Sequence, residues 1–283
     1  MNILALKLIL APIIIGSASL AGRKWGPAVS GWIVGMPLTS GPVIFFVALS
    51  HSSAFAANAA LGVLSGGLSL VAYALTYSWL ATKFRWQIAI MGSLLVFATS
   101  TTILQYFTFP LLPVFFMVAT AIVIGLRFMP NDTVVKESET KPGKWDIPIR
   151  ILIGTSFILL LTGVAPLIGS RLTGLLTTIP LYITILTIFA HRHQGPAAAA
   201  HVLRGLLYGM FAFTGFFIVL SLLIEKTSLS VSFGAAVLTA LVIQGSSLLI
   251  LNLLHGKNKK PRRPSRPPRF DYYFTTSRFL PAV

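Results

Sequence analysis

Long apolar stretches separated by short polar breaks make up most of this chain. An α-helix needs about 20 residues to cross roughly 30 Å of hydrocarbon. The pattern therefore predicts about nine transmembrane helices, bounded by turn residues and charges. The predicted spans are Ile3–Gly22, Val29–Ser50, Phe55–Ala81, Trp86–Phe107, Leu111–Phe128, Ile147–Gly169, Leu172–Ala190, Ala197–Ile224 and Ser230–Leu254.

The boundary between the fourth and fifth spans depends on proline rather than on charge. Pro110 and Pro113 interrupt an apolar stretch from Trp86 to Phe128, which is too long for one span. We therefore expect two helices here, which makes the total number of spans odd.

The two halves of the chain match each other at a constant offset of 143 residues (174 − 31). Glycine and proline carry the match, and they recur by chance less often than Ala or Leu. The matched pairs include Lys7 and Arg150, Gly26 and Gly169, Gly31 and Gly174, Pro37 and Pro180, Phe46 and Phe189, Gly62 and Gly205, and Gly66 and Gly209. A duplicated membrane unit is the simplest interpretation, and duplicated units are typical of transporters.

Equivalent points in the two copies are five predicted spans apart, so the copies insert in opposite orientations. The predicted fold is an all-α membrane protein with two inverted-topology repeats (5+4). Its parts are a first repeat with a connector helix (1–129), a polar cytoplasmic linker (130–146), a second repeat (147–255) and a basic, proline-rich cytoplasmic tail (256–283).

Lys and Arg in the short loops predict the orientation in the membrane. With a cytoplasmic tail, the inside loops carry most of the loop charge and the outside loops little, which places the N-terminus outside and the C-terminus inside. A rival interpretation makes the first 20 residues a signal peptide ending near Ser17–Ala21, but Lys7 lies inside the apolar run.

Composition excludes several classes of protein. Hydrophobic residues make up 55% of the chain and charged residues 10%, with a mean hydropathy of +0.84, unlike a soluble domain. There is no cysteine, and all six acidic residues fall outside the predicted spans. We find no catalytic constellation, metal site or cofactor motif, and we expect no enzyme activity.

Pro37 and Pro180 lie within the second and seventh spans, where proline removes a backbone donor and interrupts a helix. One interpretation is a pair of broken helices that meet around a substrate. The other is a pair of ordinary kinks whose hydroxyls bond back along the helix. The neighbouring residues that would take part in binding are Thr39, Ser40, Gly41, Thr177 and Thr178.

Basic residues inside the spans are the remaining candidates for binding. Arg204 lies about two turns into the eighth span, with His201 one turn before it and Asn58 at the matching position of the first copy. The guanidinium is predicted either to bind an anionic group of a substrate or to reach the cytoplasmic interface. Lys7 and Arg150 are predicted to reach opposite interfaces or to contact lipid phosphates.

Small residues gather in the third and eighth spans. Gly62 and Gly66 share one helix face, as do Gly205 and Gly209. We expect them to let neighbouring helices approach closely, with sliding surfaces as the alternative.

The Gly–Pro pattern of the second span, followed by a polar break and an Ala/Gly-rich third span, resembles the GlpM-like small bacterial inner-membrane proteins. Those are about half as long, so the resemblance covers each half, about Lys7–Phe107 and Arg150–Ile250. It implies a bacterial inner-membrane location and adds no catalytic residue.

These features predict a transporter or lipid flippase for an anionic or amphipathic small molecule, working by alternating access. A membrane scaffold or regulatory subunit is the first alternative and an intramembrane enzyme the second. The expected partners are membrane lipids, with anionic headgroups at the basic tail. The sequence leaves homo-oligomerisation open.

Overall fold

The computed structural model describes residues 3–24, 32–130 and 146–257, and it shows helices and turns but no strand among them. Residues 1–247 form one unit, and residues 248–283 form a second, smaller unit. Nearly all of the predicted linker (130–146) and of the predicted tail (256–283) lies outside the described residues.

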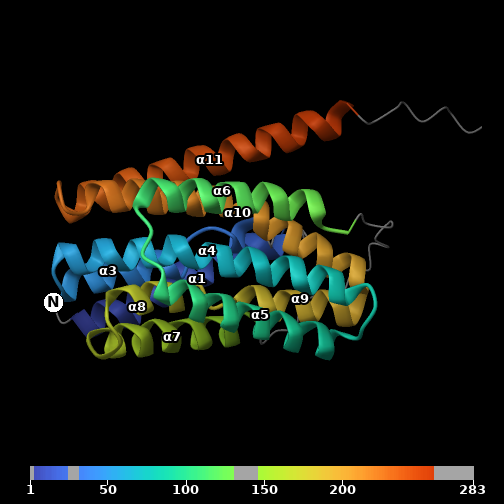
Figure 1. Ribbon diagram of the computed structural model, residues 1–283, viewed down its shortest axis with the longest axis horizontal. Coiled ribbons are helices and arrows are strands. Elements are labelled where there is room, and N and C mark those ends of the chain that lie inside the picture. The colour runs from blue at the N-terminus through green and yellow to red at the C-terminus, as the bar shows by residue number, and fades with distance from the viewer. Residues whose placement is uncertain (1–2, 25–31, 131–145, 258–283) are drawn as a thin grey trace, which may run out of the picture. The chain divides into compact units, whose positions relative to one another are not determined.

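Figure 1 shows the helices of the chain. Seven helical stretches among the described residues are long and apolar enough to cross a membrane, and the apolar α3 is shorter. The chain is therefore an integral membrane protein, as predicted. The helices are α1 (Ile3–Lys24), α3 (Ser40–Ser50), α4 (Ser53–Ala81), α5 (Trp86–Tyr106), α6 (Leu111–Phe128), α7 (Asp146–Ile168), α8 (Ser170–Leu176), α9 (Leu181–Gln194), α10 (Pro196–Leu223) and α11 (Leu229–Lys257).

The predicted boundary between the fourth and fifth spans is confirmed. Helix α5 ends at Tyr106, and α6 begins at Leu111 after Pro110, whose backbone is extended (φ −61°, ψ 157°). Proline disfavours helical geometry in the residue before it, which explains why the apolar stretch turns here without any charge.

The predicted helix breaks at Pro37 and Pro180 are also confirmed. Residues 32–34 are helical, residues 35–39 form turns, and α3 begins at Ser40. In the second half, α8 ends at Leu176 and α9 begins only at Leu181. Both interruptions fall just before or at a proline, which cannot donate the hydrogen bond that the helix requires there.

The backbone follows the same path at both breaks. The N–H of Leu38 donates to the carbonyl of Met36 (2.7 Å), and that of Leu181 donates to Ile179 (2.8 Å). Each bond closes a three-residue turn with proline at its centre. Pro180 has φ −79° and ψ 51°, close to the values of an inverse γ-turn. Residues at the same offset therefore share a local structure as well as a sequence pattern.

The chain resumes its helix in the same way after each turn. The carbonyl of Pro37 accepts from the N–H of Gly41 (2.9 Å), and the carbonyl of Pro180 accepts from Thr184 (3.0 Å). The proline carbonyl is thus the first acceptor of the new helix in both halves.

Each broken helix packs against a straight helix of the other half. In α4, a methyl group added at Gly62 would lie 2.5 Å from the carbonyl oxygen of Arg171 and 3.2 Å from the Cα of Gly174 in α8. A methyl at Gly174 would in turn meet the carbonyl oxygen of Ala59. These backbones approach too closely for a side chain between them.

The matching contact joins residues 32–35 to α10. A methyl at Gly35 would lie 2.5 Å from the carbonyl oxygen of Leu206 and 2.8 Å from the Cα of Gly209. At the constant offset, Gly35 and Gly209 correspond to Thr178 and Gly66, which are also in contact: a methyl at Gly66 would lie 2.5 Å from Thr178 Oγ1. The predicted close approach of the glycine-rich helices is confirmed.

The two glycine-rich helices α4 and α10 also pack against each other, and they run in opposite directions. In Figure 1 the turn from α3 into α4 and the turn from α10 into α11 lie at the same end of the helices. Helix α4 therefore starts at the end where α10 finishes. Helices α1 and α7 form a further contact between the halves.

Only Gly169 separates α7 from α8. Its φ of +82° with ψ of 163° is a conformation that only glycine adopts readily. Because the connection is a single residue, Arg171 is the second residue of α8 and does not lie in a loop.

Candidate functional site

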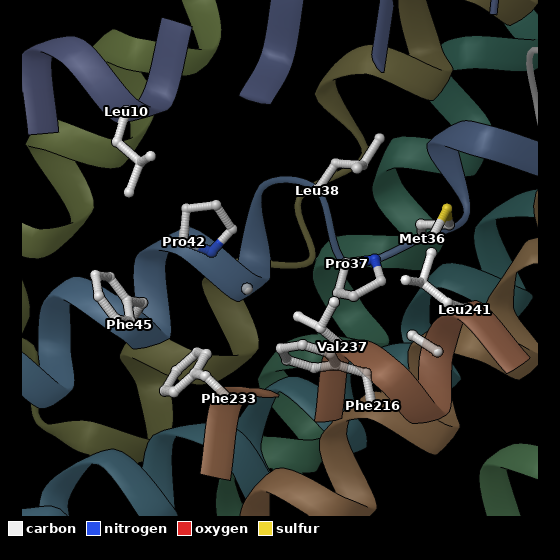
Figure 2. A pocket seen from close by; sticks show the side chains of 12 residues that line it. Leu10, Met36, Pro37, Leu38, Pro42, Phe45, Phe216, Phe233, Val237 and Leu241 are labelled. Carbon is white, nitrogen blue, oxygen red and sulfur yellow. The ribbon is translucent and has the colours of Figure 1, made fainter. Parts of the chain in front are cut away.

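A cavity of about 310 Å³ lies beside the break at Pro37. Figure 2 shows the rings of five of its lining residues: Pro37, Pro42, Phe45, Phe216 and Phe233. The rings of Phe45 and Phe233 are in edge contact, with centroids 5.1 Å apart. The walls come from α1, from residues 36–45, and from α10 and α11. The cavity therefore exists because the helix is interrupted between residues 35 and 39, where an unbroken helix would continue.

The cavity is apolar, since its lining consists only of Leu, Met, Pro, Gly, Phe, Val and Ala side chains. Two of its α11 residues, Val237 and Leu241, are also exposed on the helix surface (47% and 55%). An ion or a polar headgroup would lose its hydration here without gaining hydrogen bonds. The chemistry of the lining suits an apolar group such as a hydrocarbon chain instead.

The repeat-related positions in the second half carry different side chains. Phe216 and Gly41 correspond to Tyr73 and Thr184, whose hydroxyl groups lie 2.9 Å apart in a hydrogen bond. Tyr73 is fully buried. At these positions a threonine replaces the glycine and a tyrosine replaces the phenylalanine, and their hydroxyl groups join the two halves by a hydrogen bond.

Replacing Tyr73 by phenylalanine should lower the free energy of unfolding by about 0.5–1.5 kcal/mol, because it removes one buried hydrogen bond. The change can be measured as a lower midpoint of thermal unfolding in detergent. Tyr106→Phe is the matched control, since Tyr106 is 80% exposed and should leave the midpoint unchanged. Equal midpoints for both variants would show that the Tyr73 hydroxyl contributes nothing to stability.

At the second break, the hydroxyl groups of Thr177 and Thr178, which were predicted as binding groups, form hydrogen bonds to the backbone. Thr177 Oγ1 donates to the carbonyl of Gly174 and Thr178 Oγ1 to that of Leu175, both at 2.7 Å. These carbonyls belong to the interrupted end of α8, where they also accept from the N–H groups of Thr177 (3.1 Å) and Thr178 (3.2 Å). In this structure, Thr177 and Thr178 compensate the break locally, as one of the two interpretations of the sequence expected.

The remaining predicted residues near Pro37 differ in their surroundings. Pro37 and Gly41 line the apolar cavity. Thr39 precedes α3 without a side-chain capping bond, and Ser40 is buried at the first position of α3. Their roles in binding stay predictions.

A second cavity, of about 240 Å³, contains polar side chains. Asn58 and Ser65 reach it from α4, Thr108 from the turn before α6, and Ser170 and Arg171 from the start of α8. Asn58 was predicted as a binding residue. Arg171 and Ser170 were missed, because in the sequence they read as a turn between two spans.

Arg204 and His201 line neither of these two cavities. The guanidinium of Arg204 donates from Nη2 to the carbonyl of Pro130 (3.0 Å), just after α6. Both residues are half-buried on α10. Their predicted contact with an anionic group stays a prediction.

Lys7 lies between the halves in this structure. Its ammonium donates to Thr162 Oγ1 of α7 (2.9 Å) and lies 5.7 Å from the ring centre of Phe46. Its predicted contact with lipid phosphate stays a prediction. Arg150 is part of α7, and its side chain lies outside the described residues.

Comparison of the chain with protein-family models, with curated proteins and with solved structures gives no match. The resemblance to the GlpM-like proteins therefore stays an expectation. Functional assignment depends on the geometry of the chain itself.

Proposed function

We propose that this protein is a membrane transporter or lipid flippase that moves an amphipathic molecule with an anionic head by alternating access between two inverted repeats. The observation that carries the proposal is the pair of broken helices. They share the same turn at Pro37 and Pro180, and each packs against a glycine-rich helix of the other half.

Two further observations support the inverted arrangement. Helices α4, α5, α6 and α7 separate the two broken helices, so equivalent points are an odd number of spans apart. The corresponding helices α4 and α10 run in opposite directions (Figure 1). We propose nine spans in total: the seven membrane-length stretches, α1, and the broken helix that ends as α3.

Inverted repeats allow a protein to alternate between two states in which the halves exchange conformations. The cavity beside Pro37 and the hydrogen bond between Tyr73 and Thr184 at the related positions fit one such state. In the other state, the second break would open and the first would close. A scaffold would need no cavity at a broken helix, which is why we place transport before that alternative.

The apolar lining beside Pro37 favours a substrate with a hydrocarbon part. The anionic head would contact Arg204, whose guanidinium can hold a phosphate or carboxylate with two parallel hydrogen bonds. With the orientation taken from loop charges, Arg204 lies on the cytoplasmic side of a bacterial inner membrane.

The test is lipid movement in vesicles that contain the purified chain and a fluorescent NBD-labelled phosphatidylglycerol. Dithionite bleaches only the outer leaflet of protein-free vesicles, so bleaching of the inner-leaflet probe measures flipping. We expect the protein to add this second phase. Arg204→Ala should slow it by about 10- to 100-fold, the equivalent of one charge-assisted hydrogen bond.

Arg204→Lys should keep part of the activity, because lysine retains the charge but not the planar fork. Arg85→Ala is the control, since Arg85 is exposed before α5 and should flip lipid like the unchanged protein. Vesicles that bleach no further than protein-free ones would overturn the flippase proposal for this lipid.

A further inference from the structure

The second cavity, between α4 and α8, combines an apolar part of its wall (Leu61, Phe109) with polar side chains that can contact a small anion. Its volume of about 240 Å³ is below the roughly 300–1,000 Å³ of sites that hold drug-sized ligands. The cavity therefore suits a headgroup rather than a whole lipid. Its polar lining offers hydroxyl groups, one amide and one guanidinium.

Arg171 supplies the positive charge, and its position is fixed by a hydrogen bond. Nη2 donates to the carbonyl of Leu104 (2.8 Å) in the last turn of α5, a carbonyl that also accepts from the N–H of Phe107 (3.3 Å). A guanidinium has five N–H donors, and this bond uses one of them. The side chain is half-buried, which strengthens an interaction with an anion relative to open water.

Among the residues that the structure describes, no carboxylate is recorded in the lining of this cavity. Within the described residues, the acidic positions are Asp146, which begins α7, and Glu225, which is exposed in the turn after α10. Neither lines the cavity. The hydroxyl of Ser65 donates to the carbonyl of Leu61 in its own helix (2.9 Å). Because a hydroxyl has one donor, Ser65 does not donate to an anion while this bond is formed.

The constant offset relates this cavity to the surroundings of Arg204. Asn58 and Leu61, which line it on α4, correspond to His201 and Arg204 on α10. At the cavity, Arg171 comes from α8, which is part of the broken helix. At the related site, Arg204 comes from the unbroken helix α10. Because α4 and α10 run in opposite directions, the two arginines belong to opposite ends of the pair.

We infer that the cavity at Arg171 binds the anionic headgroup, a phosphate or carboxylate, of the transported molecule on the side opposite Arg204. This inference rests on the proposed function and adds a second headgroup site to it. In the alternating cycle, the head contacts Arg171 in one state and Arg204 in the other, while the hydrocarbon chain stays among apolar walls.

The test measures binding by the rise of the thermal unfolding midpoint of the full chain in detergent. One probe is glycerol 3-phosphate, and the other is a short-chain phosphatidylglycerol, with the matching uncharged diacylglycerol as reference. We expect a saturable rise with at least one anionic probe. Arg171→Gln should weaken its affinity about 10- to 100-fold, and Arg171→Lys less.

A second variant tests the site independently in case Arg171→Gln does not fold. Asn58→Asp places a negative charge on the exposed part of α4 that lines the cavity, and should weaken binding through repulsion. Arg85→Gln is the control and should bind like the unchanged protein. Binding of both probes supports a site that takes a free or lipid-borne anion, and binding of phosphatidylglycerol alone supports a site for a lipid headgroup.

The inference is overturned if the unchanged chain binds neither probe, or if Arg171→Gln and Asn58→Asp both bind with unaltered affinity. Its failure is distinct from failure of the proposed function. If the protein flips lipid but the rate does not depend on Arg171, only the inference of a headgroup site at Arg171 is contradicted. If binding depends on Arg171 but no lipid is flipped, only the proposal of transport is contradicted.

Discussion

Replacing Gly209 by alanine is expected to lower the free energy of unfolding by about 1–3 kcal/mol or more, the range of overpacking substitutions. The added methyl group would meet the carbonyl oxygen of Trp32 and lie 2.8 Å from the Cα of Gly35. Both are backbone atoms, so relief requires the two helices to separate. Gly174→Ala should act in the same way at the contact with Ala59.

The measurement is the midpoint of thermal unfolding in detergent, with Gly163→Ala as the matched control. Gly163 also lies in a membrane-length helix, but a methyl there meets nothing within 4 Å. This control should keep or slightly raise the midpoint, since alanine favours helix over glycine. The close packing is contradicted if Gly209→Ala unfolds at the same temperature as the control.

Filling the apolar cavity should abolish transport without unfolding the protein. At Gly41 an added Cβ has ordinary contacts, 3.6 Å to Phe216 Cζ and 3.8 Å to Pro37 Cβ, and the rest of a leucine side chain would extend into the space of about 310 Å³. We expect Gly41→Leu to slow lipid flipping at least about tenfold, because the site for the hydrocarbon chain is occupied. The burial of apolar surface should preserve the unfolding midpoint.

The flipping assay with labelled phosphatidylglycerol measures this effect, and Gly163→Leu serves as control at an open position. The control should flip lipid at the rate of the unchanged protein. A folded Gly41→Leu protein with full flipping activity would show that the substrate does not pass through the cavity beside Pro37.

The sequence predicts the helices and their interruptions well, because both follow from local rules. Hydrophobic length defines the spans, and proline chemistry places the breaks at Pro37 and Pro180. Even the boundary at Pro110 follows from these rules without any charge. Close packing at Gly62 and Gly209 follows from residue size alone.

Local sequence rules do not predict which residues line the cavities. The walls beside Pro37 come from four separate segments, and the bond from Tyr73 to Thr184 joins residues of opposite halves. Arg171 reads as a loop charge in the sequence, because nothing local shows that Gly169 alone connects α7 to α8. Only the packing against α5 reveals its half-buried guanidinium.

The exchange of packing between the halves has a consequence for biosynthesis. The glycine face of α4 packs against α8, and α8 follows three further helices in the chain, α5, α6 and α7. During insertion, this face therefore stays without its partner until the second half leaves the ribosome, because domains form as the chain emerges from its N-terminus. The first half is then a folding intermediate whose exposed glycine face on α4 can pack against another membrane helix that carries small residues. We expect a chain stopped after α6 to need a chaperone or the separately synthesised second half to escape degradation.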